Sequence, residues 1–97
     1  ADILDLHWAR SPRTATSRVG DETVLLHLES GTYFGLNPVA TLVLQGIEKQ
    51  QTPREICRTV AADHEVEIER VEADVRHLLE ELVQHDLVGT VPDHAGP

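Results

Sequence analysis

The hydrophobic pattern of the chain changes at Asn37, and this change constrains the fold more than any other feature. Before Asn37, stretches rich in β-branched and aromatic residues are punctuated by Gly20 and Gly31, which is typical of short strands joined by tight turns. After Asn37, apolar residues recur at three- and four-residue spacing, which is typical of amphipathic helices. Strands followed by helices predict an α+β fold, in which three helices pack on one face of a small antiparallel sheet.

The first part of this pattern predicts a three-stranded antiparallel meander that begins at Thr14. Its strands are expected over residues 14–19, 23–28 and 32–34. In the second strand, Val24, Leu26 and Leu28 share one apolar face, and we expect the helices to cover that face.

The starts of two helices are marked by capping residues. Asn37 precedes Pro38, and Thr52 precedes Pro53, so each pair places a capping side chain before a proline at the first helical position. Glu55 follows Thr52 by three residues, which predicts a capping box. A third, longer helix is expected from residue 68 to residue 85, with its apolar stripe formed by Val71, Val75, Leu78, Leu79 and Leu82.

The domain organisation follows from these elements. Residues 14–91 are expected to form one domain, which a short last strand over residues 87–91 would complete. Residues 92–97 are interpreted as a C-terminal tail. Residues 1–13 show no clean periodicity and are interpreted as a mobile lead-in, although Trp8 and its apolar neighbours could fold back onto a neighbouring surface.

Composition excludes several classes of function. The 97 residues carry 8 Lys and Arg against 17 Asp and Glu, a net charge of −9 that opposes binding to nucleic acid. The single cysteine, Cys57, excludes an intramolecular disulfide, and no apolar run approaches the roughly 18 residues of a membrane span. The start of the chain has no signal-peptide pattern. We therefore expect a cytoplasmic protein without membrane or nucleic-acid partners.

The residues that carry chemistry in enzymes are not arranged for it here. The six histidines include no pair at helical ligand spacing, so no metal site is predicted. Cys57 lies on the apolar stripe of the second helix, where a buried and inert thiol is expected, and no phosphate-binding loop or nucleophile elbow is present. The sequence therefore predicts a protein that is not an enzyme and has no cofactor.

Three segments resemble one protein family. Residues 23–38 (TVLLHLESGTYFGLNP), residues 52–56 (TPREI) and residues 72–82 (EADVRHLLEEL) are similar, in order and spacing, to PqqD-like proteins. These are the stand-alone recognition elements for precursors of ribosomally synthesised and post-translationally modified peptides (RiPPs). The form Gly-x-Tyr-Phe-x-Leu-Asn is most like the branch found with lasso-peptide biosynthesis. Glu67 departs from the Asp that usually precedes the third helix of the family.

The resemblance implies a winged helix-turn-helix-like fold and a function in peptide binding. In the family, the third strand accepts the leader segment of a precursor peptide as an added antiparallel strand, in a groove against the third helix. No chemistry occurs there. The leader is delivered to separate enzymes, which in lasso systems are a leader peptidase (a cysteine protease) and a lasso cyclase (an ATP-dependent macrolactam synthetase).

The resemblance also implies which residues bind the leader. The pairing edge falls on Thr32, Tyr33, Phe34 and Gly35, and the facing wall on Arg70, Val71, Asp74, Val75 and Leu78. Strand alternation lets only one of the two aromatic rings face the helices, and the sequence leaves open which one. The apolar wall residues could equally be plain core, and Arg70 and Asp74 could equally form a surface pair at i, i+4 spacing.

Two other functions compete with leader recognition. A winged-helix regulator that binds DNA has the same set of elements, but acidic residues outnumber basic ones by five to two between Glu69 and Glu81. A scaffold subunit of a modifying enzyme would leave leader binding to the enzyme itself.

Overall fold

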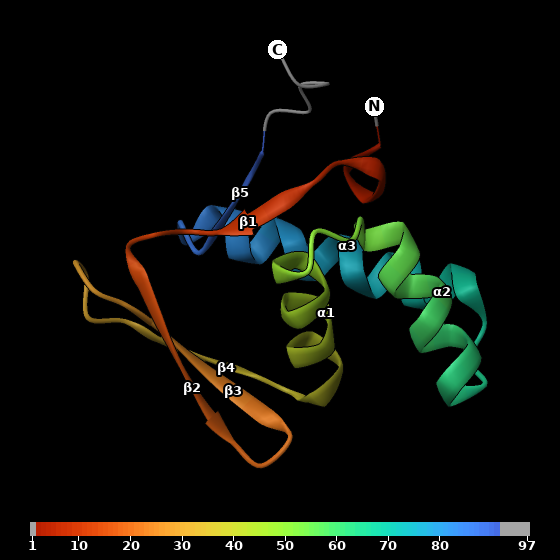
Figure 1. Cartoon of the computed structure of the whole chain (residues 1–97), viewed down its shortest axis with the longest axis horizontal. Coiled ribbons are helices and arrows are strands. Elements are labelled where there is room, and N and C mark those ends of the chain that lie inside the picture. The colour runs from red at the N-terminus through yellow and green to blue at the C-terminus, as the bar shows by residue number, and fades with distance from the viewer. Residues whose placement is uncertain (1, 92–97) are drawn as a thin grey trace.

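The structure, a computed structural model, describes residues 2–91 of the chain. It confirms the α+β class and the order of strands before helices (Figure 1). In chain order the elements are a 3-10 helix η1 (Ile3–Asp5), strands β1 (Trp8–Arg10), β2 (Thr14–Val19), β3 (Glu22–His27) and β4 (Tyr33–Leu36), helices α1 (Pro38–Glu48), α2 (Pro53–His64) and α3 (Ile68–Gln84), and strand β5 (Val88–Thr90). The likeness to a winged helix-turn-helix stays a prediction.

The predicted meander is an antiparallel sheet in the order β2-β3-β4, with β3 in the centre. Gly20 (φ 65°) and Gly31 (φ 72°) occupy the left-handed conformation in the turns on either side of β3, as their places in the sequence predicted. Figure 1 shows that this sheet projects away from the helices toward the lower left, so much of its surface has no helix over it. Because the sheet has only three strands and does not close, its outer strands β2 and β4 are edge strands.

The face of β3 that packs against the helices is opposite to the predicted one. Leu25 and His27 are buried, whereas Val24 and Leu26 are half-buried and Leu28 is exposed. The prediction was wrong because it counted apolar residues and took His27 as a mark of the outer face. A histidine can be buried at little cost when its ring nitrogens have hydrogen-bond partners, and His27 has them.

The helix starts follow their capping residues as predicted. The Asn37 side chain accepts a hydrogen bond of 2.8 Å from the N–H of Ala40 at the start of α1. Thr52 and Glu55 form the complete capping box of α2. Glu67, which stands before α3, makes no side-chain capping bond, so α3 depends on its packing rather than on its cap.

The N-terminal segment differs from the mobile lead-in that was expected over residues 1–13. Strand β1 pairs antiparallel with β5, with Trp8 opposite Thr90. Leu4 and Trp8 lie in the hydrophobic core, and the indole N–H of Trp8 donates to the carbonyl of Ile3 at 3.0 Å. A three-residue strand whose partner lies about 80 positions away has no local signal, so the sequence could not reveal this pairing. Ala1 and residues 92–97 lie outside the described residues.

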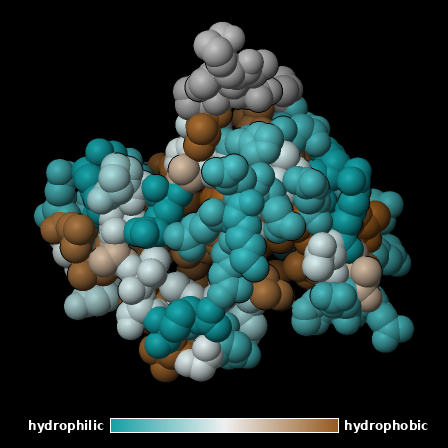
Figure 2. All heavy atoms as spheres, in the orientation of Figure 1, coloured by the Kyte–Doolittle hydropathy of each residue, from teal (hydrophilic) through white to brown (hydrophobic). Residues whose placement is uncertain are grey.

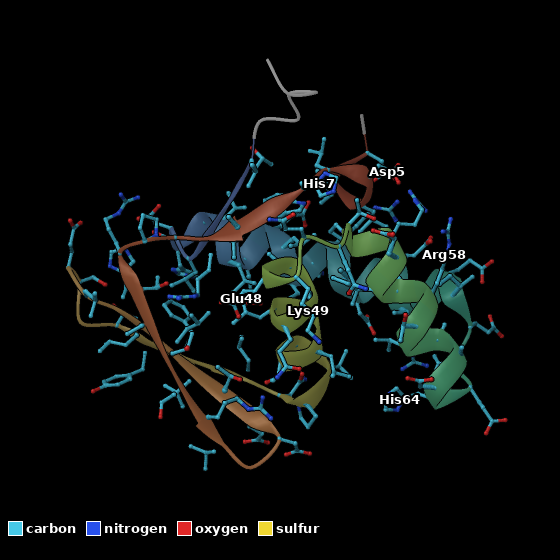
Figure 3. The ribbon with its side chains drawn as sticks, viewed as in Figure 1. Asp5, His7, Glu48, Lys49, Arg58 and His64 are labelled. Carbon is cyan, nitrogen blue, oxygen red and sulfur yellow. The ribbon has the colours of Figure 1, made fainter. Side chains whose placement is uncertain are left out.

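A cluster of ion pairs holds η1 against the helices. Arg54 on α2 contacts Asp2, Asp5 and Glu72, and Arg76 on α3 contacts Asp2 at 2.6 Å. Figure 3 shows Asp5 above the start of α2. The hydrogen bond from Arg76 is the largest cause that lowers the pKa of Asp2 to about 2. Because this value is below the ordinary 3.8, the ion pairs of Asp2 stabilise the folded state above pH 3.8, and this contribution is lost as the pH falls toward 2 and the carboxylate is protonated.

Replacing Trp8 tests whether the N-terminal segment belongs to the domain. Because the Trp8 side chain is only 7% exposed, Trp8→Ala is expected to lower the free energy of unfolding by about 3–5 kcal/mol in a urea titration. Val19→Ala is the control, since Val19 is 65% exposed and its loss is expected to change the free energy by about 0.5 kcal/mol or less. Equal unfolding curves for the two variants would instead support a mobile lead-in.

Candidate functional site

Strand β4 has one free side, and the hydrogen-bond register decides which of its backbone groups point there. The N–H of His27 donates to the carbonyl of Thr32 at 2.9 Å, so these two residues form a hydrogen-bonded pair. Such pairs alternate with pairs that exchange no bonds along an antiparallel ladder. On the other side of β3, the N–H of Leu28 donates to the carbonyl of Arg13 at 2.8 Å. The backbone groups of Leu28 therefore point to β2 and those of its neighbour His27 point to β4, which agrees with this alternation.

This register directs the backbone groups of Tyr33 and Gly35 away from β3, to the free side of β4. Phe34 and Leu36 stand opposite Leu25 and Thr23 in hydrogen-bonded pairs, so their N–H and C=O groups point to β3. The N–H and C=O groups of Tyr33 and Gly35 therefore point to the free side, and no backbone group within residues 2–91 bonds them. The sequence YFGL contains no charged residue and no proline, the residue types that commonly prevent another strand from pairing with a sheet edge.

The two aromatic side chains of β4 lie on opposite faces of the sheet. Phe34 is half-buried, packs against the hydrophobic core, and has its ring centroid 4.6 Å from that of His85 at the end of α3. Tyr33 is 70% exposed on the other face. The structure thus settles the choice that the sequence left open: Phe34 faces the helices.

A pocket of about 370 Å³ lies where the start of β4 meets the end of α3, and we call it the polar pocket. It is lined by His27, Ser30, Thr32, Phe34, Gln84, His85 and Asp86. Of these residues, only Thr32 and Phe34 were among the predicted site residues. His27 was missed because sequence reasoning assigned Leu25 and His27 to the face away from the helices.

Hydrogen bonds fix the wall of the polar pocket. The N–H of Ser30 donates to His27 Nδ1 at 3.3 Å, so His27 carries its proton on Nε2, which donates to Asp86 at 3.1 Å. Arg13 donates to both carboxylate oxygens of Asp86, each at 2.9 Å. The hydrogen bonds from His27 and then from Arg13 lower the pKa of Asp86, which therefore stays ionised near neutral pH.

A second pocket, of about 340 Å³, lies among α1, α2 and the first half of α3, and we call it the valine pocket. It is lined by Val39, Val60, His64, Val66, Arg70, Val71, Asp74 and Val75. Figure 3 shows His64 at the C-terminal end of α2. No ion pair joins Arg70 to Asp74 within residues 2–91, so the surface-pair alternative is not observed.

The two pockets lie near opposite ends of α3, and we refer to them together as the β4–α3 crevice. The chain passes from Phe34 at the polar pocket to Val39 at the valine pocket, while α3 passes the same pockets in the reverse direction. Leu78, between the two ends of α3, is half-buried against the core and lines neither pocket. Of the predicted residues, Thr32 and Phe34 line the polar pocket, and the valine pocket holds Arg70, Val71, Asp74 and Val75. Tyr33, Gly35 and Leu78 line neither pocket, and that any of these residues binds a ligand stays a prediction.

Neither a reactive thiol nor a metal-binding cluster is found within residues 2–91. Cys57 is fully buried, and burial raises its pKa to about 11, so the thiol stays protonated and unreactive at neutral pH. No group of three or more His, Cys, Asp or Glu side chains in residues 2–91 could hold a metal ion. Over the same residues, no helix combines the length and apolar character that crossing a membrane requires.

Comparison with known proteins shows the family. The model of the family described as coenzyme PQQ synthesis protein D (PqqD) matches residues 22–88, more than half of the chain. The chain belongs to the PqqD family. No curated protein matches it. The match begins at β3 and ends in β5, so it includes both sides of the β4–α3 crevice.

Two solved structures are similar to this PqqD family member. One is described as TbiB1 in complex with the TbiA(beta) leader peptide, with 34% identity, a TM-score of 0.79, and coverage of 88% of this chain and 99% of that one. The other, lasso peptide synthetase B1 complexed with the leader peptide, has 24% identity and the same TM-score, with coverage of 89% and 99%. The predicted resemblance to PqqD-like proteins is confirmed, and both similar structures are described as complexes with a leader peptide.

Amide exchange in the free protein tests the assigned register. We expect the amide protons of Tyr33 and Gly35 to exchange rapidly with solvent deuterium, and those of Phe34 and Leu36 to be protected. The measurement is residue-resolved NMR exchange. Protection of Tyr33 and Gly35 with rapid exchange of the other two amides would reverse the register.

Proposed function

We propose that this protein is a non-catalytic recognition element that binds the leader segment of a ribosomally made lasso-peptide precursor. The leader adds to β4 as an antiparallel strand, lies in the β4–α3 crevice, and is delivered to the leader peptidase and the macrolactam synthetase. The observation that carries the proposal is the unguarded edge of β4, where Tyr33 and Gly35 present free backbone groups. The similarity to TbiB1, whose structure contains a leader peptide, supports the same ligand class.

The energetics assign different tasks to the edge and to the pockets. Tyr33 and Gly35 each offer one donor and one acceptor, and four added hydrogen bonds at about 1 kcal/mol each stabilise the complex by about 4 kcal/mol. Ordering a disordered leader costs about 2–5 kcal/mol, which offsets this gain. Net affinity must therefore come from leader side chains that enter the polar and valine pockets. The edge supplies orientation, and the pockets supply affinity and selectivity.

The charge of the chain separates this proposal from DNA binding. Leader addition to β4 needs no positive surface, whereas DNA affinity depends on clustered Lys and Arg. The chain has 8 such residues against 17 acidic ones, and four of them are already paired with carboxylates: Arg10, Arg13, Arg54 and Arg76. The leader peptide is the partner that these features support.

Removing one outward N–H tests strand addition directly. Gly35→Pro deletes the outward amide while an edge strand still tolerates proline, so leader affinity is expected to fall about tenfold or more. The measurement is fluorescence polarisation of the labelled leader peptide of a lasso-peptide precursor.

Two matched controls accompany the variant Gly35→Pro. Gly35→Ala keeps the amide, and its added Cβ would meet nothing within 4 Å, so it should bind as the unmodified protein does. Thr16→Pro deletes an amide that points outward from β2, at the opposite edge of the sheet, and should also leave binding unchanged. Full affinity of a folded Gly35→Pro variant would contradict pairing at this edge.

Truncating Phe34 tests the polar pocket. The ring of Phe34 lines that pocket, whereas the Tyr33 ring points to the other face of the sheet. Phe34→Ala is expected to weaken leader binding about tenfold or more, and Tyr33→Ala to weaken it less. Circular dichroism checks that both variants are folded. Equal effects of the two substitutions in the polarisation titration would remove Phe34 from the pocket that binds the leader.

A further inference from the structure

An apolar pocket of about 310 Å³ lies between the N-terminal segment and the last turns of α3, and we call it the Trp8 pocket. It is lined by Ile3, Trp8, Leu79, Glu80, Val83 and Gln84. Figure 1 shows η1 and β1 above α3, which brings segments far apart in the sequence to one site. Leu79 is fully buried, whereas Glu80 and Gln84 are exposed, so the pocket has an apolar floor and a partly polar rim.

The N-terminal wall of the Trp8 pocket is fixed and offers apolar contact. The indole N–H of Trp8 already donates to the carbonyl of Ile3 at 3.0 Å, so it is not available to a ligand. Next to Ile3, Asp2 pairs with Arg76 on α3 at 2.6 Å, and this ion pair holds the wall against the helix. A pocket whose walls are already ordered binds an apolar side chain at a lower entropic cost.

Gln84 joins the Trp8 pocket to the polar pocket, because it lines both. An antiparallel leader runs from the Leu36 end of β4 to the Tyr33 end, so its C-terminal part leaves the strand at the polar pocket. From there the way to the Trp8 pocket crosses the exposed side of α3 at Gln84. Half the circumference of a helix about 10–12 Å in diameter is about 16–19 Å, which about five or six extended residues span.

A peptide fits the Trp8 pocket better than a broad protein surface does. Its volume is at the lower end of the range of about 300–1,000 Å³ that ligand pockets have, which suits one large apolar side chain. Figure 2 shows that hydrophobic side chains on the face it displays form small groups among hydrophilic ones, whereas protein interfaces have a continuous apolar core. A second copy of this chain is disfavoured by its net charge of −9.

We propose that the Trp8 pocket binds an apolar side chain of the leader, about five or six residues C-terminal to the segment that pairs with β4. This inference rests on the proposed function, because strand addition brings the leader to Gln84. Ile3 and Trp8 precede residues 22–88, which the PqqD family model matches, so the N-terminal segment supplies a contact outside that match. The leader is then held on both sides of the end of α3, which fixes the direction in which its C-terminal part leaves the protein.

The fluorescence of Trp8 reports whether the pocket is occupied. Trp8 is the only tryptophan in the chain, so the emission responds to an apolar side chain placed beside this one indole ring. The protein is titrated with the leader of a lasso-peptide precursor, in which any tryptophan is replaced by phenylalanine, in a complete and a shortened form. The shortened leader is the shortest peptide, truncated from its C-terminal end, that still protects the amides of Tyr33 and Gly35.

The two leaders are expected to differ in both readouts. The complete leader should shift the emission of Trp8 and bind about tenfold more tightly than the shortened one, because it buries one more apolar side chain. The shortened leader should bind without shifting the emission.

Val83→Asp tests the pocket from the side of α3. Val83 lines the pocket and is 46% exposed, so the fold accepts a carboxylate there, while the pocket becomes unfavourable for an apolar side chain. Leu42→Asp on α1 is the matched control, because Leu42 is 42% exposed and lines none of the three pockets assigned to the leader. We expect Val83→Asp to lose the emission shift and to bind the complete leader about tenfold more weakly, with normal binding of the shortened leader. Leu42→Asp should change none of these values.

Several results would overturn the Trp8 pocket as a leader site and leave the proposed function standing. Unchanged emission at saturation with the complete leader is one, and an equal loss of affinity of Val83→Asp for both leaders is another. An emission shift in the free protein on removal of residues 92–97, or on dilution, would assign the pocket to the chain's own C-terminal segment or to a second copy, and would also overturn it. Failure of the unmodified protein to bind either leader would overturn the proposed function itself.

Discussion

The pairing register between β3 and β4 is the constraint on which the rest of the site depends. Because Phe34 exchanges its backbone bonds with Leu25, the neighbouring residues Tyr33 and Gly35 must turn theirs outward. The same register places the Phe34 ring toward the helices and the Tyr33 ring toward solvent. A shift by one residue would exchange both sets of groups: the backbone groups of Phe34 and Leu36 would then point to the free side, and the Phe34 ring would face away from the helices.

The surroundings of His27 keep this register and the polar pocket in place. His27 is buried on the inner face of β3, yet both of its ring nitrogens have partners, one in the β3–β4 turn and one in Asp86 beyond α3. Arg13, just before β2, binds the same carboxylate. Three segments that are distant in sequence thus meet at one carboxylate, which fixes the end of α3 beside β4 and preorganises the crevice.

The sequence was most informative where structure is decided locally. The capping residues Asn37 and Thr52 act on the next turn of chain, and the glycines in the turns act on their own backbone, so these elements were predictable. The inner face of β3 was not, because burial of His27 depends on Asp86, 59 positions later. The β1–β5 pairing and the polar pocket are likewise formed by residues that lie far apart in the sequence. Family resemblance suggested β4 and α3 as the binding elements, but only the structure places Thr32 and Phe34 at one pocket and the first half of α3 at another.

The most direct test of the account is amide exchange of the protein with and without bound leader, measured by NMR. Strand addition at β4 predicts that the amides of Tyr33 and Gly35 become protected when the leader is bound, while the outward amide of Thr16 on β2 stays in rapid exchange. If the leader binds and the exchange of Tyr33 and Gly35 does not change, the leader does not pair with this edge. The central claim would then be contradicted.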